Sequence, residues 1–335
     1  MLSIYPKQYR SLLSVRDTQV AIKAIKDWFE VSLAQELNLT RVSAPLFVRP
    51  ETGLNDNLNG VERPVTFTVK GLGERQCEVV QSLAKWKRFA LKKYSFHPGE
   101  GLYTDMNAVR RDEELDNLHS IYVDQWDWEA IIDRKDRNLW TLMGYVRKIY
   151  KALKQTERRL IQAFPVLETY LLDRISFITS QELEDAYPEL TPRERENVHA
   201  RKKGAICIMQ IGGPLRSGMR HDGRAPDYDD WQLNADILVH YPVLDCAVEI
   251  SSMGIRVDER SLDVQLKLAG ADDRRSLPYH QDVLAGRLPQ TIGGGIGQSR
   301  LCMILLGKAH IGEVQCSVWP QDMVEECKKS NILLL

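Results

Sequence analysis

The chain has 335 residues, 45 of them basic and 46 acidic, which gives a formal charge of −1 at pH 7. This balance provides no net field for nucleic acid or an acidic membrane, and no apolar run approaches the roughly 20 residues of a membrane-spanning helix. The six cysteines are dispersed without metal-site spacing, so we expect reduced, mostly buried thiols. With no signal-peptide pattern at the N-terminus, we expect a soluble cytoplasmic protein that binds neither nucleic acid nor membrane.

The first predicted element is an amphipathic helix over residues 17–37, with Asp17 as its N-cap. A short strand over 41–48 follows, with Pro45 inside it. Because proline is confined to strand edges and bulges, we expect this strand at a sheet edge or a subunit boundary. Apolar residues recur at helical spacing in the helix: Ile22, Ile25, Phe29, Leu33 and Leu37.

Further along, short strands are predicted around 65–69 and 77–82, and a helix begins near Leu83. The segment 119–129 alternates in polarity and predicts a strand. Its polar residues Gln125, Asp127 and Glu129 share one face, and Trp126 and Trp128 share the other. This pattern fits the floor of a binding site, and it fits an ordinary half-exposed antiparallel strand equally well.

The second half predicts a helix over 136–164, strands over 205–210, 235–241 and 245–252, and helices over 259–269 and 277–286. On the 245–252 strand, alternation places Asp245, Ala247, Glu249 and Ser251 on one face. Strands in consecutive runs with helices between the runs favour an α+β fold, with helices on one side of an antiparallel sheet. We expect a single domain over 1–335.

The segment from Thr291 to Arg300 has glycines at alternate positions, including Gly293 and Gly295, and leads into an apolar helix. Glycine allows a ligand to approach the backbone closely, and an arginine in the first helical turn suits a phosphate. The spacing matches neither the dinucleotide-binding fingerprint nor the P-loop. These residues alone leave two interpretations, a nucleotide-binding floor and a glycine-rich turn before a core helix.

Three other groups of residues carry candidate chemistry. Ser82 and Lys87 lie where a predicted strand ends and a helix begins, a common position for substrate contacts. Arg110 precedes the alternating strand, where it can form a solvated ion pair or bind an α-phosphate through both guanidinium nitrogens. Asp236 and Glu249 lie on adjacent predicted strands and suit Mg²⁺, which takes one or two carboxylates together with nucleotide oxygens.

Together these motifs resemble the catalytic core of class II aminoacyl-tRNA synthetases, most closely the aspartate and asparagine branch. Region 17–48 resembles motif 1, which builds the dimer interface in those enzymes; region 101–130, with Arg110, resembles motif 2. Region 291–320, with Arg300, resembles motif 3. Only about 16 residues precede the first helix, so we expect no counterpart of the N-terminal OB-fold module that binds the anticodon in those enzymes.

A second family is more similar along nearly the whole chain. Several longer strings resemble ammonia-dependent asparagine synthetase (aspartate–ammonia ligase), at 56–60, 82–88, 99–104, 122–128, 224–231, 251–256 and 289–300. One departure follows Trp231, where the segment before Asp236 is several residues shorter than is usual in that family. This puts in doubt a flexible flap over ATP at that position, but not the core chemistry.

The resemblance implies ATP-dependent synthesis of L-asparagine from L-aspartate and ammonia through β-aspartyl-AMP, with release of AMP and pyrophosphate. It also implies Mg²⁺ and a homodimer. The implied catalytic residues are Asp56, Lys87, Arg110 and Arg300. The implied aspartate-binding residues are Asp56, Ser82, Lys87, Gln125, Asp127, Ser251 and Arg256. The implied ATP-binding residues are Arg110, Asp112, Glu113, Asp229, Asp236, Glu249, Gly293, Gly294, Gly295 and Arg300, with Asp236 and Glu249 as metal ligands.

Free ammonia is the expected nitrogen donor, because no cysteine follows Met1 as a glutaminase nucleophile and no separate glutaminase region is present. Two alternatives stay open. A paralogue of aspartyl-tRNA synthetase would activate the α-carboxylate, and the missing anticodon module counts against it. A non-catalytic amino-acid sensor would be expected to have lost catalytic residues, whereas Arg110, Glu249 and Arg300 are all present.

Overall fold

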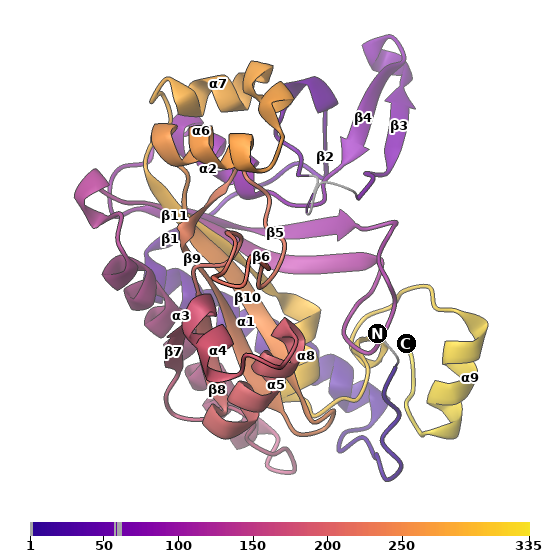
Figure 1. The fold of residues 1–335 in the computed structure, drawn as a ribbon. Coiled ribbons are helices and arrows are strands. Elements are labelled where there is room, and N and C mark those ends of the chain that lie inside the picture. The colour runs from indigo at the N-terminus through magenta and orange to yellow at the C-terminus, as the bar shows by residue number, and fades with distance from the viewer. Residues whose placement is uncertain (1–2, 57, 59–61) are drawn as a thin grey trace.

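A computed structural model describes residues 3–56, 58 and 62–335, so residues 57, 59 and 60 of the 56–60 string lie outside the described part. An eight-stranded sheet forms the centre, and a three-stranded sheet projects beyond one end of it (Figure 1). In spatial order the large sheet contains β1 (Leu39–Arg41), β5 (Gly101–Val109), β6 (Tyr122–Ile131), β11 (Thr291–Gly297), β10 (Cys246–Arg256), β9 (Asp229–Tyr241), β8 (Ala205–Met209) and β7 (Ser176–Thr179). The small sheet contains β2 (Phe47–Val48), β4 (Arg75–Val79) and β3 (Thr66–Val69).

Helices cover both faces of the large sheet, whereas the sequence predicted helices on one side only. One face packs its apolar side chains, Trp126 and Trp128 among them, against α1 (Val15–Leu37), α3 (Leu139–Ala163) and α8 (Gln298–Leu305). The opposite face packs against α2 (Ala84–Lys93) at the β5 end and against α4 (Ser180–Ala186) and α5 (Pro192–Lys203) at the β8 end. The stretch of this face between those helices remains open.

The remaining helices lie around this frame. Helices α6 (Glu259–Leu268) and α7 (Pro278–Leu284) share a small apolar core and lie near α2 in Figure 1, while α9 (Gln321–Lys329) lies near both chain ends. Short 3₁₀ turns span Pro50–Thr52, Lys70–Leu72, Arg134–Asp136, Asp272–Ser276 and Ile311–Glu313.

The predicted α+β class and most predicted elements are confirmed, with two local corrections at the start of the chain and one to the sheet. Helix α1 is capped by Ser14, whose Oγ accepts a hydrogen bond from the amide of Asp17, so Asp17 is not the N-cap. Pro45 lies in irregular chain between β1 and β2 and divides the strand predicted there. The sheet is also mixed: β1 pairs with β5 and β7 with β8 in parallel, and the other pairs are antiparallel.

Strand β10 differs from the predicted alternation because it carries a β-bulge. Glu249 pairs with Leu238, but Ser251 pairs with the next residue, Ile237, so one extra residue is inserted on β10. Such an insertion reverses the facing of the residues beyond it. Ser252 therefore shares a face with Glu249, and Ser251 turns to the other side. The prediction that Ser251 faces the same way as Glu249 is wrong.

The glycine segment 291–297 is a strand in the middle of the sheet, between β6 and β10, and not a turn. It leads directly into α8, as predicted. The six cysteines form no disulfide, and all except Cys316 are buried, as expected. In the part of the chain that the structure describes, no helix is both long and apolar enough to span a membrane.

Candidate active site

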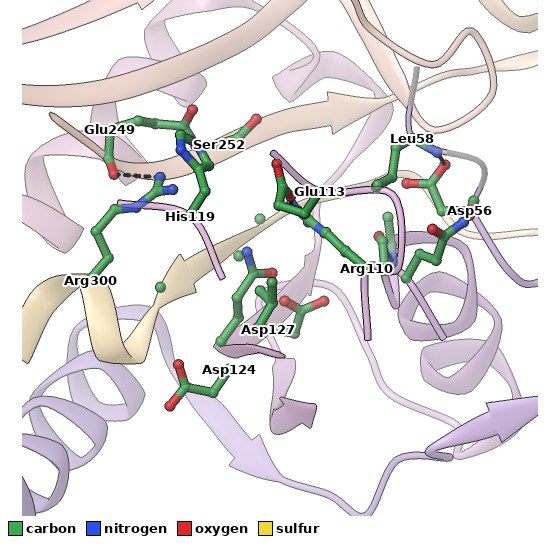
Figure 2. A pocket seen from close by; sticks show the side chains of 18 of the residues that line it. Asp56, Leu58, Arg110, Glu113, His119, Asp124, Asp127, Glu249, Ser252 and Arg300 are labelled. Atoms are coloured by element: carbon green, nitrogen blue, oxygen red, sulfur yellow. Dashed lines mark hydrogen bonds and ion pairs between the residues drawn. The ribbon is translucent and has the colours of Figure 1, made fainter. Parts of the chain in front are cut away.

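A cavity of about 400 Å³ opens on the uncovered part of the sheet face, over β6, β10 and β11. Figure 2 shows Arg300, Glu249 and His119 at one end, Asp56 at the other, and Arg110 between them. Most of the residues predicted from the sequence line this one cavity: Asp56, Ser82, Lys87, Arg110, Asp112, Glu113, Gln125, Asp127, Asp229, Glu249, Arg256, Gly294, Gly295 and Arg300.

Three predicted residues do not line the cavity. Ser251 lies on the core side of the bulge, and its Oγ is buried with no partner within the described residues. Gly293 lies beneath side chains of Glu129 and Arg256, which occupy the space that a Cβ would need. Asp236 lies behind Arg224, with which it forms an ion pair. A direct contact of Ser251 or Gly293 with a ligand in this cavity is therefore not supported.

The glycines of β11 make room for side chains that lie across the sheet. A Cβ on Gly295 would lie 2.5 Å from Oε1 of Gln125 and 2.8 Å from Oδ1 of Asp127. None of the β11 glycines has a positive φ, so glycine is needed here for close approach and not for backbone conformation. The carbonyl oxygen of Gly294 also accepts a hydrogen bond from Lys87 Nζ at 2.9 Å.

Arg256 lies between two buried carboxylates at the floor of the cavity. Its Nε and Nη2 donate to Glu129 at 3.0 and 2.7 Å, and its Nη1 donates to Asp229. Thr291 Oγ1 donates to Glu129 as well, at 2.7 Å. Burial raises the pKa of Asp229, while the charge of Arg256 opposes that rise. Two buried carboxylates therefore hold the one guanidinium from both sides.

Lys87 on α2 is almost completely buried and points to the same floor. Its Nζ lies 2.9 Å from Oδ2 of Asp127. Burial lowers the pKa of Lys87, and Asp127 partly restores it. The second oxygen of Asp127, Oδ1, is buried without a hydrogen-bond partner among the described residues. Ser82 Oγ accepts from the amide of Ala84 at 3.1 Å and helps to fix the start of α2.

Asp56 lies at the far end of the cavity with one free acceptor. Oδ1 accepts from the amide of Leu58 at 3.0 Å, but buried Oδ2 finds no partner in the described chain. The main chain of Asp56 is fixed by Asn55 and Gln81, since Asn55 Oδ1 accepts from the Asp56 amide and Gln81 Nε2 donates to the Asp56 carbonyl. Burial raises the pKa of Asp56 to about 6.

This raised pKa predicts a pH dependence of stability. Between about pH 4 and pH 6 the folded protein binds a proton at Asp56 that the unfolded chain has released. The contribution of Asp56 to the free energy of unfolding therefore falls by about 3 kcal/mol as pH rises through that window. Urea unfolding of the wild type and of Asp56→Asn should show the variant gaining relative stability from pH 4 to pH 7. A pH-independent difference between the two proteins would contradict the assignment.

Two arginines line the rest of the cavity, Arg110 in its middle and Arg300 at the end far from Asp56. Arg110 follows β5; its Nη1 lies 3.7 Å from Glu113, and its buried Nε has no partner among the described residues. Arg300 rests on main-chain oxygens, with Nη1 donating to the carbonyl of Glu249 at 3.0 Å. Asp112 is held by Arg63, whose hydrogen bonds lower the pKa of Asp112 to about 2.

Asp236 and Glu249 lie on adjacent strands, as the sequence predicted. Burial raises the pKa of each carboxyl, and their mutual repulsion raises that of Glu249 further. Asp236 Oδ1 is buried and lacks a partner in the described residues. No group of three or more Cys, His, Asp and Glu side chains within residues 3–56, 58 and 62–335 is arranged to hold a metal. The pair therefore fits Mg²⁺ only if phosphate and water oxygens complete its shell.

Several lining residues were not predicted. Asp222 and Arg224 lie on the loop before β9, Ser252 reaches the cavity because of the bulge, and His119 pairs with Asp116 at 2.8 Å. Glu129 was placed on the polar face of its strand, but its pairing with Arg256 was not foreseen. The similar string at 224–231 was the available signal for Arg224, since it begins at that arginine.

Comparison with known proteins supports one family. The profile of a family described as aspartate–ammonia ligase matches residues 16–331. Curated proteins of that name from Ruminiclostridium cellulolyticum and Levilactobacillus brevis are 64% and 60% identical, each over 99% of both chains.

Solved structures resemble the chain at the level of fold. Asparaginyl-tRNA synthetase from Pyrococcus horikoshii, complexed with asparaginyl-adenylate, matches with a TM-score of 0.67 and 16% identity, over 91% of this chain and 70% of that one. The asparaginyl-tRNA synthetase of Entamoeba histolytica matches with a TM-score of 0.63 and 15% identity, over 90% and 67%. At such low identity the likeness shows the class II synthetase fold alone.

Proposed function

The chain belongs to the aspartate–ammonia ligase family, and we propose that it makes L-asparagine from L-aspartate, ammonia and ATP through β-aspartyl-AMP. In the first step an oxygen of the β-carboxylate attacks the α-phosphorus of ATP, and the bond to pyrophosphate breaks. In the second step ammonia attacks the acyl carbon, AMP leaves, and a proton is released. Adenylation is required because a free carboxylate would have to expel oxide.

One observation carries the proposal: the cavity has free carboxylate oxygens on Asp56 and Asp127, Arg300 at the end far from Asp56, and Arg110 between those two ends. Asp127 Oδ1 and Asp56 Oδ2 are buried acceptors that lack partners in the described chain, and an α-ammonium group of aspartate would satisfy them. Gln125 lines the same region. Lys87 lies beside Asp127 and would contact the reacting β-carboxylate.

The nucleotide would lie at the opposite end. We assign Arg110 to the α-phosphate because it lies between the two ends of the cavity in Figure 2, and Arg300 to the terminal phosphates. Such cations stabilise the charge that develops on the phosphate in the transition state. Gly295 would act indirectly, because it leaves room for the side chains of Gln125 and Asp127 that line the cavity. Asp236 and Glu249 would hold Mg²⁺, which would draw charge from the phosphates.

Arg256 would bind the α-carboxylate of aspartate. Each guanidinium nitrogen of Arg256 donates to Glu129 or Asp229. Because Nη1 and Nη2 each carry two hydrogens, each has one N–H left to donate to a substrate. With the α-carboxylate held there, the β-carboxylate would point toward Lys87 and Arg110. This orientation distinguishes the proposed reaction from activation of the α-carboxylate for transfer to tRNA.

The reaction is tested by incubating the protein with aspartate, ATP, Mg²⁺ and ammonium and measuring asparagine, AMP and pyrophosphate together. Equal amounts of the three products are expected, and ADP in place of AMP would contradict the adenylate. Glutamine should not replace ammonium. With hydroxylamine as the acceptor, the β-hydroxamate of aspartate is expected, whereas the α-hydroxamate would favour the tRNA-synthetase-like alternative.

We also propose that the chain is a single catalytic domain that works as a homodimer in the cytoplasm. The support for the dimer is apolar surface on α1 and in the segment after Pro45, including Val20, Val31 and Leu46, each at least half exposed. The cytoplasm is consistent with cysteines that form no disulfide. Sedimentation velocity at micromolar concentration should give a mass near twice that of the chain.

A further inference from the structure

Arg224 occupies an unusual position beside the proposed metal ligands. Its Nη2 pairs with Asp236, and its Nη1 donates to Oδ2 of Asp222 at 2.8 Å and to the carbonyl of Gly223 at 3.0 Å. Burial raises the pKa of Glu249, and the charge of Arg224 partly opposes that rise. The guanidinium is therefore surrounded by three carboxylates at the phosphate end of the cavity.

Asp236 retains an unused oxygen in this arrangement. Asp236 is only 6% exposed, and its Oδ1 lacks a hydrogen-bond partner in the described residues. A structural ion pair usually satisfies both oxygens of a buried carboxylate, as Arg256 and Thr291 do for Glu129. Arg224 satisfies one oxygen of Asp236, and the facing Ser252 hydroxyl also opposes the rise that burial causes in the pKa of this carboxyl. Oδ1 itself makes no hydrogen bond in the described residues, so it is available to a second cation.

The surroundings of Arg224 also differ from those of Arg256. Arg256 is on a central strand and is held on both sides by carboxylates that are at most 3% exposed. Arg224 is on the loop before β9, and its second partner, Asp222, has a side chain that is 55% exposed. An exposed ion pair is weak, so on that side the guanidinium is held mainly by the hydrogen bond to the carbonyl of Gly223.

We propose that the guanidinium of Arg224 neutralises Asp236 in the ligand-free enzyme. When a divalent metal binds at Asp236, the guanidinium moves away and contacts the nucleotide phosphates. This rests on the metal site assigned under the proposed function. Adding a divalent ion beside an unmoved guanidinium would bring like charges together. Moving the guanidinium toward the phosphates removes that repulsion. Binding of metal and binding of nucleotide would therefore favour each other.

The test measures Mn²⁺ binding by electron paramagnetic resonance, without nucleotide, in the wild type, Arg224→Met and Arg224→Lys. Arg224→Met should bind Mn²⁺ about tenfold more tightly or better, because it loses the competing charge. Arg224→Lys keeps the charge and should stay as weak as the wild type. Arg216→Met is the matched control: it lies on the same loop, its side chain is 75% exposed, and it pairs with Asp185 away from the cavity.

A second measurement adds a non-hydrolysable ATP analogue. It should raise the Mn²⁺ affinity of the wild type several-fold more than that of Arg224→Met, because the variant has no guanidinium to transfer to the phosphates. Adding Asp236→Asn to Arg224→Met should abolish the gained metal affinity. Unchanged Mn²⁺ affinity in Arg224→Met, or equal affinities in the Met and Lys variants, would overturn the role of Arg224.

These outcomes separate the two proposals. If Asp236→Asn and Glu249→Gln bind Mn²⁺ with the analogue as tightly as the wild type does, the proposed metal site is wrong, whatever Arg224 does. If those variants lose Mn²⁺ binding and Arg224→Met behaves as the wild type, the metal site stands and Arg224 is only structural. Thermal unfolding of each variant confirms that the folded protein is being compared.

Discussion

Replacing Arg256 with alanine is expected to raise the KM for aspartate about 100-fold or more, and to destabilise the fold by about 3–5 kcal/mol. The kinetic effect follows from losing the proposed contact with the α-carboxylate. The loss of stability follows from Glu129 and Asp229, which are 0% and 2% exposed and would be left buried without their shared counter-charge. The KM for ATP should change only a few-fold, because the nucleotide contacts lie elsewhere.

The two effects can be separated with a second variant. In Glu129→Gln combined with Arg256→Met, one buried charge is removed along with the arginine, so part of the stability should return while the aspartate KM stays high. Urea unfolding gives the stabilities, and pyrophosphate release at varied aspartate and ATP gives the two KM values. An unchanged aspartate KM in a folded Arg256→Ala protein would disprove the assignment.

The instability of Arg256→Ala should also depend on pH. Without the arginine, burial raises the pKa of Asp229 further, so the folded variant holds a proton that the unfolded chain releases. A raised carboxyl pKa makes stability fall as pH rises through the window between the unfolded and folded values. The difference in unfolding free energy between wild type and variant should therefore be larger at pH 8 than at pH 5.

The sequence predicted those parts of the site that follow from local periodicity. Alternation along 119–129 correctly placed Trp126 and Trp128 in the core and Gln125 and Asp127 toward the cavity. The alternate glycines predicted close approach of a ligand, whereas the structure places the side chains of Glu129, Arg256, Gln125 and Asp127 over Gly293 and Gly295. The family resemblance then supplied residues from distant segments, most of which meet in one cavity.

The parts of the site that the sequence did not predict depend on tertiary contacts, which leave no pattern in the neighbouring sequence. A bulge in β10 changed which serine faces the cavity, because one inserted residue reverses every side chain beyond it. The position of Gly293 away from the cavity has a related reason: the space above it is filled by Glu129 and Arg256, which come from two other strands. The cation beside Asp236 comes from a loop, Arg224, whose position no periodicity determines.

Lys87 and Lys85 on α2 are both buried and paired, but they differ in whether they reach the cavity. Both are on α2, both are buried, and each pairs with an aspartate, Lys87 with Asp127 at 2.9 Å and Lys85 with Asp227 at 3.0 Å. Only Lys87 lines the cavity; Lys85 lies behind it, where Asp227 also binds Arg274. Methionine at either position removes a buried cation, so each variant should lose about 3 kcal/mol of stability.

The catalytic effects should differ. Lys87→Met is expected to lower kcat/KM for aspartate about 100- to 1,000-fold, because Lys87 would hold the attacking β-carboxylate and neutralise part of the charge that develops on the phosphate. In Lys85→Met, kcat/KM for aspartate should fall by less than about tenfold at the optimum pH of the variant. Because Lys85 lowers the pKa of Asp56, its loss should instead move the pH profile upward. Equal losses of kcat/KM in the two variants, measured at matched folded fractions, would show that Lys87 acts through packing and not through contact with the substrate.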